Sequence, residues 1–268
     1  MTLPRRRWQD MTAKEFAAIE EPERVVAVLP VGSVEQHGPH LPVWCDSGLV
    51  EGILDAAAAH LPPDLPVLTM PMVPYGFSME HTAYPGTVSL SAETLVRLLV
   101  EIGESVHGAG LRRLVIVNGH GGQPQILDIV ARELRTRLGM LVVPCSWWRL
   151  GLPEGLFPPA ELAHGIHGGA VETSMMLHLA PGLVNRAEVR NFESLGAEAE
   201  SEFRRLSATG PVAFAWAAQD LNPVGVCGDA RLAEAGHGRS LVEFAAAGLA
   251  ELLEEVGRFP LDALRERV

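Results

Sequence analysis

Metal-ligating side chains gather in one short stretch of the chain, VGSVEQHGPHLPVWCDSG at residues 31–48. Glu35, His37 and Asp46 lie there among prolines and glycines, directly after an apolar run. Placing such groups in a protein interior costs free energy unless something pairs with them. Carboxylate and imidazole are ligands of Zn, Mn and Fe. In extended chain, residues two apart point to the same side, so Glu35 and His37 are placed to face one ion.

Two further clusters repeat this chemistry. NGHGG, residues 118–122, follows the apolar run LVIV, and its glycines allow a tight turn from which His120 projects. HGGAVETS, residues 167–174, places Glu172 shortly after His167, at the expected start of a helix. Two metals that share a bridging carboxylate need about five or six protein ligands. The three clusters together supply that number, which predicts a two-metal site.

Each of these residues also has a structural interpretation. A lone histidine at a strand end more often forms structural hydrogen bonds than binds a metal. Asp46 or Ser47 is placed to cap the helix that follows, and Glu172 suits a solvated helix face. His40 is expected only to pack or to form hydrogen bonds in its loop. Cys45 is either a thiol nucleophile or, as is commoner for cysteine, a small buried residue.

The pattern of apolar residues predicts the elements that position these clusters. Short apolar runs at 24–31, 65–76, 114–117 and 140–148 read as strands. Amphipathic runs at 47–61, 91–110, 124–139, 168–182 and 237–257 read as helices, with Ser91 as an N-cap. Uniformly apolar strands that alternate with helices imply an α/β layered fold with a mostly parallel central sheet. Ligands in such folds bind at the carboxyl ends of the strands, where the three polar clusters fall.

Composition narrows the classes of function. The 268 residues suffice for one large α/β domain or two small ones. A net charge of −12 argues against nucleic acid as a partner, and no apolar run approaches the ~20 residues of a membrane span. No secretory signal is expected from the N-terminal residues. Cys45, Cys145 and Cys227 lie far apart, which fits a reducing cytoplasm rather than a disulfide scaffold.

Several other enzyme classes lack their motifs here. Lys14 is the only lysine, so there is no Walker A lysine, and Lys14 is a poor candidate for a Schiff base. The sequence has no G-x-S-x-G elbow and no H-E-x-x-H helix. It also lacks a G-x-G-x-x-G segment opening a helix after the first strand. The metal interpretation therefore stands without a competing motif.

Four segments, in order, resemble the creatininase (creatinine amidohydrolase) family: GSVEQHGPHLPVWCD, YPGTVSL, NGHGG and HGGAVETS. The similarity runs from about residue 25 to 181, and GVCGDARLAEAGHG near the end is also similar. The resemblance implies one α/β domain over residues 1–268, usually assembled as a hexamer. It further implies a two-metal site that hydrolyses C–N bonds of amides.

The resemblance also assigns roles, residue by residue. It implies five metal ligands: Glu35, His37, Asp46, His120 and Glu172. Among them Glu35 and His37 bind different metals and Asp46 is the bridging carboxylate. His167 resembles the histidine that contacts substrate or moves a proton. The cofactors expected are two divalent ions, Zn first, with Mn or Fe as alternatives, since imidazole and carboxylate suit all three.

The sequence departs from creatininases proper around the substrate. They follow N-G-H with Tyr-Glu, whose glutamate binds metal, whereas this chain has Gly121 and Gly122. They carry a carboxylate just before the histidine of the H-G-G motif, where this chain has Ile166, and their Trp-Asp pair is not evident in AELAHGI. The hydrolytic residues are thus retained while the creatinine-reading groups are largely missing. Tyr75, Phe77, Trp147 and Trp148 are candidates for lining a pocket, with ordinary packing as the alternative.

The expected function is metal-assisted hydrolysis of the C–N bond of a cyclic or small amide by a water bridging two ions. His167 would then deliver a proton to the leaving nitrogen. One alternative is a peptidase or deformylase like the mycofactocin maturase of the same family, and another is a non-catalytic binding protein on this fold. A homo-oligomer is expected, and the loop YGFSMEHTAYPG is a candidate to complete a neighbouring subunit's site. His81 in that loop is either a site residue or a structural one.

Overall fold

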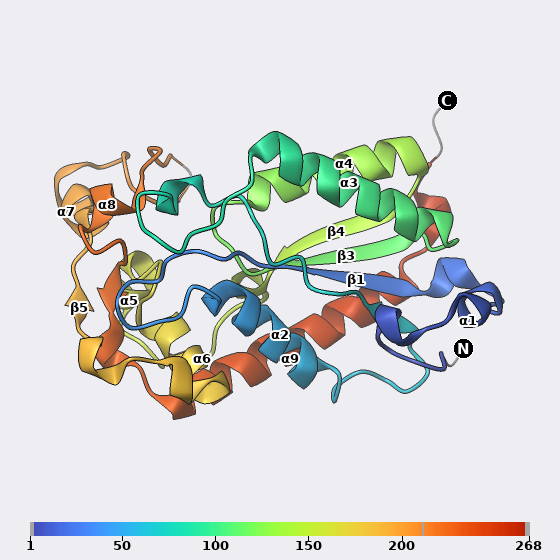
Figure 1. Ribbon diagram of the computed structural model, residues 1–268, viewed down its shortest axis with the longest axis horizontal. Coiled ribbons are helices and arrows are strands. Elements are labelled where there is room, and N and C mark those ends of the chain that lie inside the picture. Colours follow the sequence, from blue (N-terminus) through green and yellow to red (C-terminus); the bar gives the residue numbers. More distant parts are fainter. Residues whose placement is uncertain (1–2, 211, 266–268) are drawn as a thin grey trace.

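The computed structural model describes residues 3–210 and 212–265. Its centre is a parallel four-stranded sheet in the order β2-β1-β3-β4 (Figure 1). The strands are β1 (Val26–Val31), β2 (Val67–Thr69), β3 (Arg113–Asn118) and β4 (Leu141–Ser146). Every residue of β1 and β3 is buried, as expected for a parallel sheet that is covered on both faces. A small antiparallel pair, β5 (Asn191–Phe192) and β6 (Gly228–Asp229), lies outside this sheet.

Helices cover both faces of the sheet. One face packs against α3 (Ala92–Gly108) and α4 (Pro124–Leu138), and the other against α2 (Cys45–Ala57) and α9 (Ala235–Arg258), while α6 (Ala170–Leu179) packs on α2 and α9 near the carboxyl ends of the strands (Figure 1). Successive residues of β1 point to opposite faces: Val26 and Val28 join the core under α2 and α9, while Ala27 and Leu29 join the core under α3 and α4. The shorter helices are α1 (Ala13–Ala17), α5 (Pro159–His164), α7 (Leu195–Glu202) and α8 (Ala218–Leu221). The predicted α/β layered fold with a parallel central sheet is confirmed.

Two predictions about element boundaries are wrong. The strand expected over 65–76 is reduced to Val67–Thr69, because Pro66, Pro71 and Pro74 have no N–H to offer a sheet ladder. The helix expected from residue 47 begins at Cys45, with Trp44 at its N-cap and no capping side chain. Ser91, in contrast, caps α3 as predicted, since its hydroxyl accepts a hydrogen bond from the Thr94 N–H.

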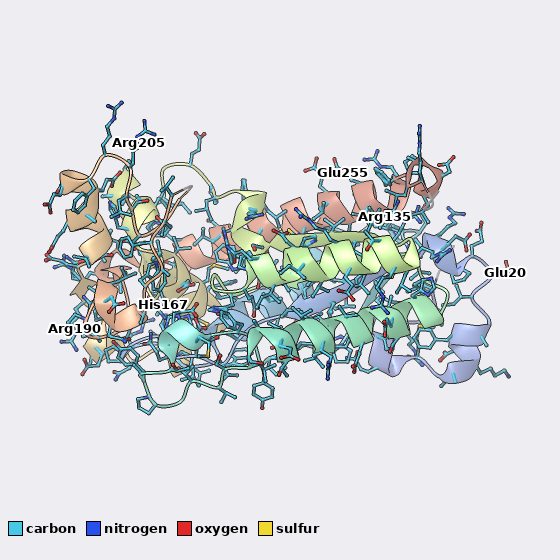
Figure 2. The ribbon with its side chains drawn as sticks, turned by 90° about the horizontal axis from the view of Figure 1, so that it is seen from above. Glu20, Arg135, His167, Arg190, Arg205 and Glu255 are labelled. Atoms are coloured by element: carbon cyan, nitrogen blue, oxygen red, sulfur yellow. The ribbon has the colours of Figure 1, made fainter. Side chains whose placement is uncertain are left out.

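The carboxyl ends of the strands open toward one end of the molecule. Figure 2 shows His167 near that end and Glu20 at the opposite one. The loop after β1 (residues 32–44) and the turn after β3 (residues 119–123) both leave the sheet there. Within the described residues, no helix has the length and apolar character needed to cross a bilayer. The polar clusters of the sequence therefore meet at one edge of the sheet.

Candidate metal centre

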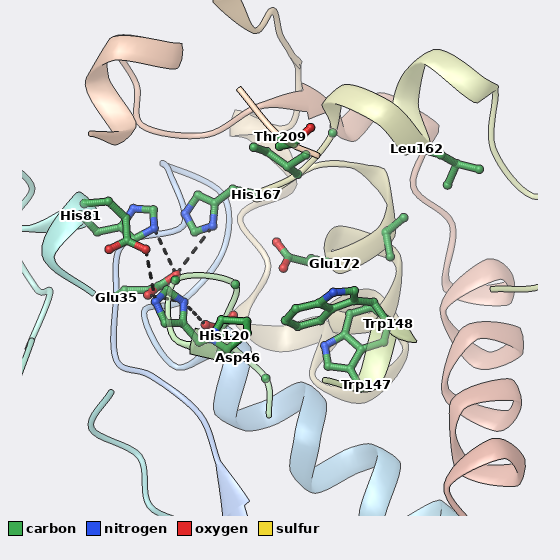
Figure 3. A pocket seen from close by; sticks show the side chains of 18 of the residues that line it. Glu35, Asp46, His81, His120, Trp147, Trp148, Leu162, His167, Glu172 and Thr209 are labelled. Atoms are coloured by element: carbon green, nitrogen blue, oxygen red, sulfur yellow. Dashed lines mark ion pairs between the residues drawn. The ribbon is translucent and has the colours of Figure 1, made fainter. Parts of the chain in front are cut away.

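A cavity of about 540 Å³ lies at this edge (Figure 3). Five of the six predicted site residues line it: Glu35, Asp46, His120, His167 and Glu172. The sixth, His37, is fully buried beside them. The structure thus brings together residues that are up to 137 positions apart in the chain, from Glu35 to Glu172.

Asp46 lies between two histidines. Its Oδ1 is 3.2 Å from His37 Nε2, and its Oδ2 is 3.2 Å from His120 Nδ1. The Ser33 hydroxyl donates a 2.6 Å hydrogen bond to Oδ2, which fixes the carboxylate. Although Asp46 falls in the first turn of α2, it does not cap the helix, because both its oxygens face these partners. One oxygen directed at each of two imidazoles is the arrangement required of a carboxylate that bridges two ions.

The first potential ion-binding group consists of Glu35, Asp46 and His120. Glu35 Oε2 lies 2.9 Å from His120 Nδ1. The turn that carries His120 is held by Asn118, whose side chain accepts a hydrogen bond from the His120 N–H and donates one to the His120 carbonyl. Gly119 is required in this turn because a Cβ there would lie 2.6 Å from the Asp46 carbonyl oxygen. The tight turn predicted for NGHGG is confirmed, with Gly121 and Gly122 as turn residues.

The second group surrounds His37 and comprises His37, Cys45 and Glu172. Glu172 Oε2 lies 3.7 Å from His37 Nε2 and accepts a 2.6 Å hydrogen bond from the Gly168 N–H. Cys45 is fully buried in the hydrophobic core, and burial raises the pKa of its thiol to about 12. A protonated thiol that does not line the cavity supports the interpretation of Cys45 as a small buried residue, not as a nucleophile.

His167 presents one ring nitrogen to the site. Its Nε2 donates a 2.8 Å hydrogen bond to the Gln36 carbonyl, so Nδ1 faces Glu35 Oε1 at 3.7 Å. Burial, together with the nearby His37 and His81, holds the pKa of His167 well below its ordinary value. His167 is therefore neutral, with a lone pair directed at the reaction cavity.

The charges of the cluster are unbalanced. Burial lowers the pKa of His37 and His120, but neighbouring groups outweigh it and leave both pKa values well above 6.5. The carboxylates responsible are Asp46 for His37, whose other neighbour Cys45 is protonated and uncharged, and Glu35 and Asp46 for His120. Burial raises the pKa of Glu172 to about 7. The buried carboxylates thus favour protonation of the neighbouring histidines, because a nearby negative charge stabilises the imidazolium form. A cluster with this excess of negative charge is suited to bind cations.

Two atoms of the cluster are unsatisfied. Glu35 Oε2 and His37 Nε2 are buried side-chain atoms without a hydrogen-bond partner among the described residues. Buried polar atoms are normally paired, so such an exception calls for an explanation. Two ligands on one zinc ion, each about 2.1 Å from it, lie about 3.0–3.4 Å apart. The contacts of 2.9–3.2 Å made by Asp46, Glu35 and the two histidines fit that spacing. The residues present therefore suit divalent cations.

The loop after β2 adds residues that the sequence analysis did not assign. His81 Nε2 lies 3.4 Å from Glu35 Oε1, and its Nδ1 faces the side-chain amide of Gln36 at 2.9 Å. His81 thus lies in the site of its own chain. Glu80 approaches His120 Nε2 at 3.4 Å and was missed entirely. The only signal was an acidic and an imidazole side chain side by side in a glycine- and proline-rich loop. His40, as expected, only forms hydrogen bonds within the fold, with its Nε2 2.9 Å from the Gly168 carbonyl oxygen.

The opposite wall of the cavity is apolar. Trp147 and Trp148 lie across from the histidines in Figure 3 and line the cavity as expected. Further apolar side chains complete this wall: Leu152, Leu162, Ile166, Val171 and Trp216. Tyr75 and Phe77 do not line it, because Tyr75 is half exposed and Phe77 packs against the core under α3 and α4.

Comparisons with known proteins point to one family. The creatininase family model, described as creatinine amidohydrolase, matches residues 9–253. The mycofactocin precursor peptide peptidase of Mycobacterium ulcerans (strain Agy99) is 34% identical over 221 residues, which cover 80% of this chain and 78% of that protein. The creatinine amidohydrolase of Pseudomonas putida is 33% identical over 192 residues, which cover 66% of this chain and 72% of that protein.

Solved structures of creatininase share the fold. A creatininase variant with one tryptophan replaced by alanine superposes with a TM-score of 0.75 at 25% identity, covering 97% of this chain and 100% of that one. Another variant, described as a Zn–Zn type, gives a TM-score of 0.73 at 27% identity, covering 95% and 98%. A manganese form gives 0.70 at 25% identity, covering 95% and 98%. With a family model spanning nearly its whole length, this chain belongs to the creatininase family of hydrolases acting on C–N bonds.

Proposed function

We propose that the protein is an amidohydrolase with two divalent metal ions. The observation that carries this proposal is the position of Asp46, whose two oxygens face His37 and His120 while Glu35 Oε2 and His37 Nε2 lack partners. In this proposal Glu35, Asp46 and His120 hold one ion. The other is held by His37, Glu172 and the shared Asp46. Zinc is the first choice and Mn or Fe the alternatives, since the same ligand types suit all three.

The chain's own residues define the reaction that fits this site. The two ions would polarise the amide carbonyl and acidify a water molecule. His167 is placed to take up a proton from that water and pass it to the leaving nitrogen, because it is neutral and turns Nδ1 toward the cavity. The tryptophan-rich wall orients the substrate and excludes bulk water. Only the ligand position that Gly122 occupies is lost, and Glu172 is placed to replace it, which disfavours a binding protein without turnover.

Substrate size separates two candidates. Creatinine amidohydrolase acts on a small cyclic amide, as its name states, while the mycobacterial relatives are named peptide peptidases. A cavity of about 540 Å³ with seven apolar lining residues has room for more than a small cyclic amide. We propose a small amide substrate by family resemblance, and the spare room in the cavity supports the end of a peptide as the second candidate.

One experiment tests the proposed function directly. The purified protein is stripped of metal with a chelator and reloaded with Zn²⁺, Mn²⁺ or Fe²⁺. Creatinine, N-acyl amides and short peptides are then assayed for hydrolysis. Activity should vanish on stripping and return with one of the ions. Full activity in the stripped protein would refute the proposal.

Assembly and location complete the proposal. We propose a homo-oligomer, a hexamer by family resemblance, located in the cytoplasm. Support for the reducing compartment comes from the three cysteines, which are all free and buried. Light scattering on the purified protein tests the oligomeric state, and a monomer at micromolar concentration would contradict it.

A further inference from the structure

The Glu80 carboxylate occupies the space in which a side chain at position 122 would lie. A Cβ built on Gly122 would lie 1.9 Å from Glu80 Oε1 and 2.5 Å from His120 Nε2. The φ angle of Gly122 is not positive, so its backbone conformation admits a side chain and only this crowding opposes one. The loop between β2 and α3 thus inserts a carboxylate where residue 122 would otherwise carry its own side chain. The absence of a side chain at Gly122 is what lets Glu80 reach His120.

The carboxylate of Glu80 completes a ring of oxygen atoms around one nitrogen of His120. The Phe77 carbonyl oxygen lies 2.9 Å from Nε2, while Glu80 Oε1 and the Ser78 hydroxyl each lie 3.4 Å away. A carbonyl accepts hydrogen bonds but cannot donate them, so Nε2 carries a proton. Because the proton is on Nε2, Nδ1 carries a lone pair through which it is free to bind a metal ion.

The other nitrogen faces the metal centre. His120 Nδ1 lies 2.9 Å from Glu35 Oε2 and 3.2 Å from Asp46 Oδ2. A carboxylate behind a metal-binding histidine fixes its ring orientation and raises its basicity. Glu80 is 13% exposed at its side chain and lines the cavity, so its negative charge is only partly screened by water.

We propose that Glu80 is a positioning residue that prepares His120 as a metal ligand, and that Gly122 is its required companion. The inference rests on the proposed metal function of His120. It adds a residue from a loop that carries none of the predicted ligands. It also gives the second glycine of NGHGG, Gly122, a physical role: it leaves an open space that a carboxylate from elsewhere in the chain fills.

Zinc affinity tests the role of Glu80. Glu80→Gln keeps the size of the side chain and removes its charge, whereas Glu80→Ala removes both. Competition with a chromophoric chelator should show weaker binding of one Zn²⁺ ion, by about tenfold in the Gln variant and up to about 100-fold in the Ala variant. Circular dichroism and thermal melting confirm that each variant is folded. The matched control is Glu243→Gln, which removes a carboxylate 3.3 Å from the exposed His60 and should leave zinc affinity unchanged.

The outcomes separate the possible explanations. A Gln variant that binds zinc as tightly as the wild type would show that Glu80 only fills space, and would overturn the inference. Loss of binding in the wild type itself would refute the proposed metal function instead. The partnership with Gly122 is tested by Gly122→Ala: because the methyl group would already displace the carboxylate, adding Glu80→Ala should weaken zinc binding little further. Fully additive losses would overturn the partnership.

Discussion

Glu35 Oε2 lies 2.9 Å from His120 Nδ1, yet this oxygen has no hydrogen-bond partner among the described residues. Because Nε2 of the same ring already faces the Phe77 carbonyl, Nδ1 offers a lone pair toward a carboxylate. Two electron-rich atoms at this distance repel each other unless a cation lies with them. Either a divalent ion or a second proton on the ring removes the conflict.

A pH dependence follows for the metal-stripped protein. His37 and His120 have folded-state pKa values well above 6.5. A group that binds a proton more tightly when folded stabilises the protein fully below its unfolded pKa and loses that stabilisation as the pH rises through its folded pKa. The melting temperature of the stripped protein should therefore fall as the pH rises above about 6.5.

The zinc-loaded protein provides the control, because bound ions replace these protons. Its melting temperature should stay level over the same range, so the gap between the two forms should widen with pH. Burial lowers the pKa values of His167 and His81, so these two residues change the stability only below about pH 6.5. They therefore do not contribute to the change expected above that pH. A stripped protein whose stability is level or rises above pH 6.5 would contradict the assignment.

The sequence carried enough information for the sheet and for most of the cluster. Uniformly apolar runs predicted the strands β1 and β3. Ligands placed just after such runs lie at one edge of a parallel sheet, where the carboxyl ends of its strands meet. The spacing of Glu35 and His37 predicted that both side chains point to the same side, and the glycines around His120 predicted the turn from which it projects.

What could not be predicted depends on contacts between distant segments. Glu80 and His81 lie in a loop with neither helical nor strand periodicity, so nothing local indicates that this loop crosses the NGHGG turn. Asp46 was ambiguous for another reason: aspartate near a helix start is equally a cap or a ligand, and only the positions of His37 and His120 decide.

The bridging role proposed for Asp46 predicts that a single substitution weakens the binding of both ions. Asp46→Asn keeps the shape of the side chain but replaces one carboxylate oxygen by an NH₂ group, which does not bind a cation. Elemental analysis should find about two equivalents of metal in the wild type and less than about one in the variant. Asp55→Asn, at an aspartate whose side chain is 72% exposed and paired with Arg7, is the matched control and should retain both ions. Full metal content in Asp46→Asn would rule out a bridging carboxylate at this position.

His167 should affect turnover without affecting metal. Its ring nitrogens face the Gln36 carbonyl and the cavity, and it is not among the five proposed ligands. His167→Gln should lower kcat by about 10²–10⁴-fold on whichever amide the wild type hydrolyses. Metal content should not change. His60→Gln, at an exposed histidine that pairs with Glu243, serves as control. Because His167 lies beside Glu35 and His37, a variant that loses metal together with activity would identify it as a ligand and contradict this role.

Glu161 should stabilise the segment that carries His167 and Glu172. Its buried carboxylate accepts two 2.7 Å hydrogen bonds, from the N–H groups of Ala170 at the start of α6 and of Asp229 in β6. Glu161→Gln would turn an N–H₂ group toward one of these donors. Since hydrogen bonds to charged groups contribute about 1.5–3 kcal/mol each, we expect a loss of about 2–4 kcal/mol in the free energy of unfolding.

For a chain of this size such a loss lowers the melting temperature by about 5–12 °C, which differential scanning calorimetry resolves. Glu251→Gln, at an exposed position of α9, changes the same charge without touching a buried hydrogen bond and should melt with the wild type. The carboxylate also lies within 2.7 Å of where side chains at Gly165, Gly169 and Gly228 would begin, so a side chain at any of these positions would displace it. If Glu161→Gln melted with the control, the two N–H groups would have found other acceptors, and the H-G-G segment would owe its position to packing alone.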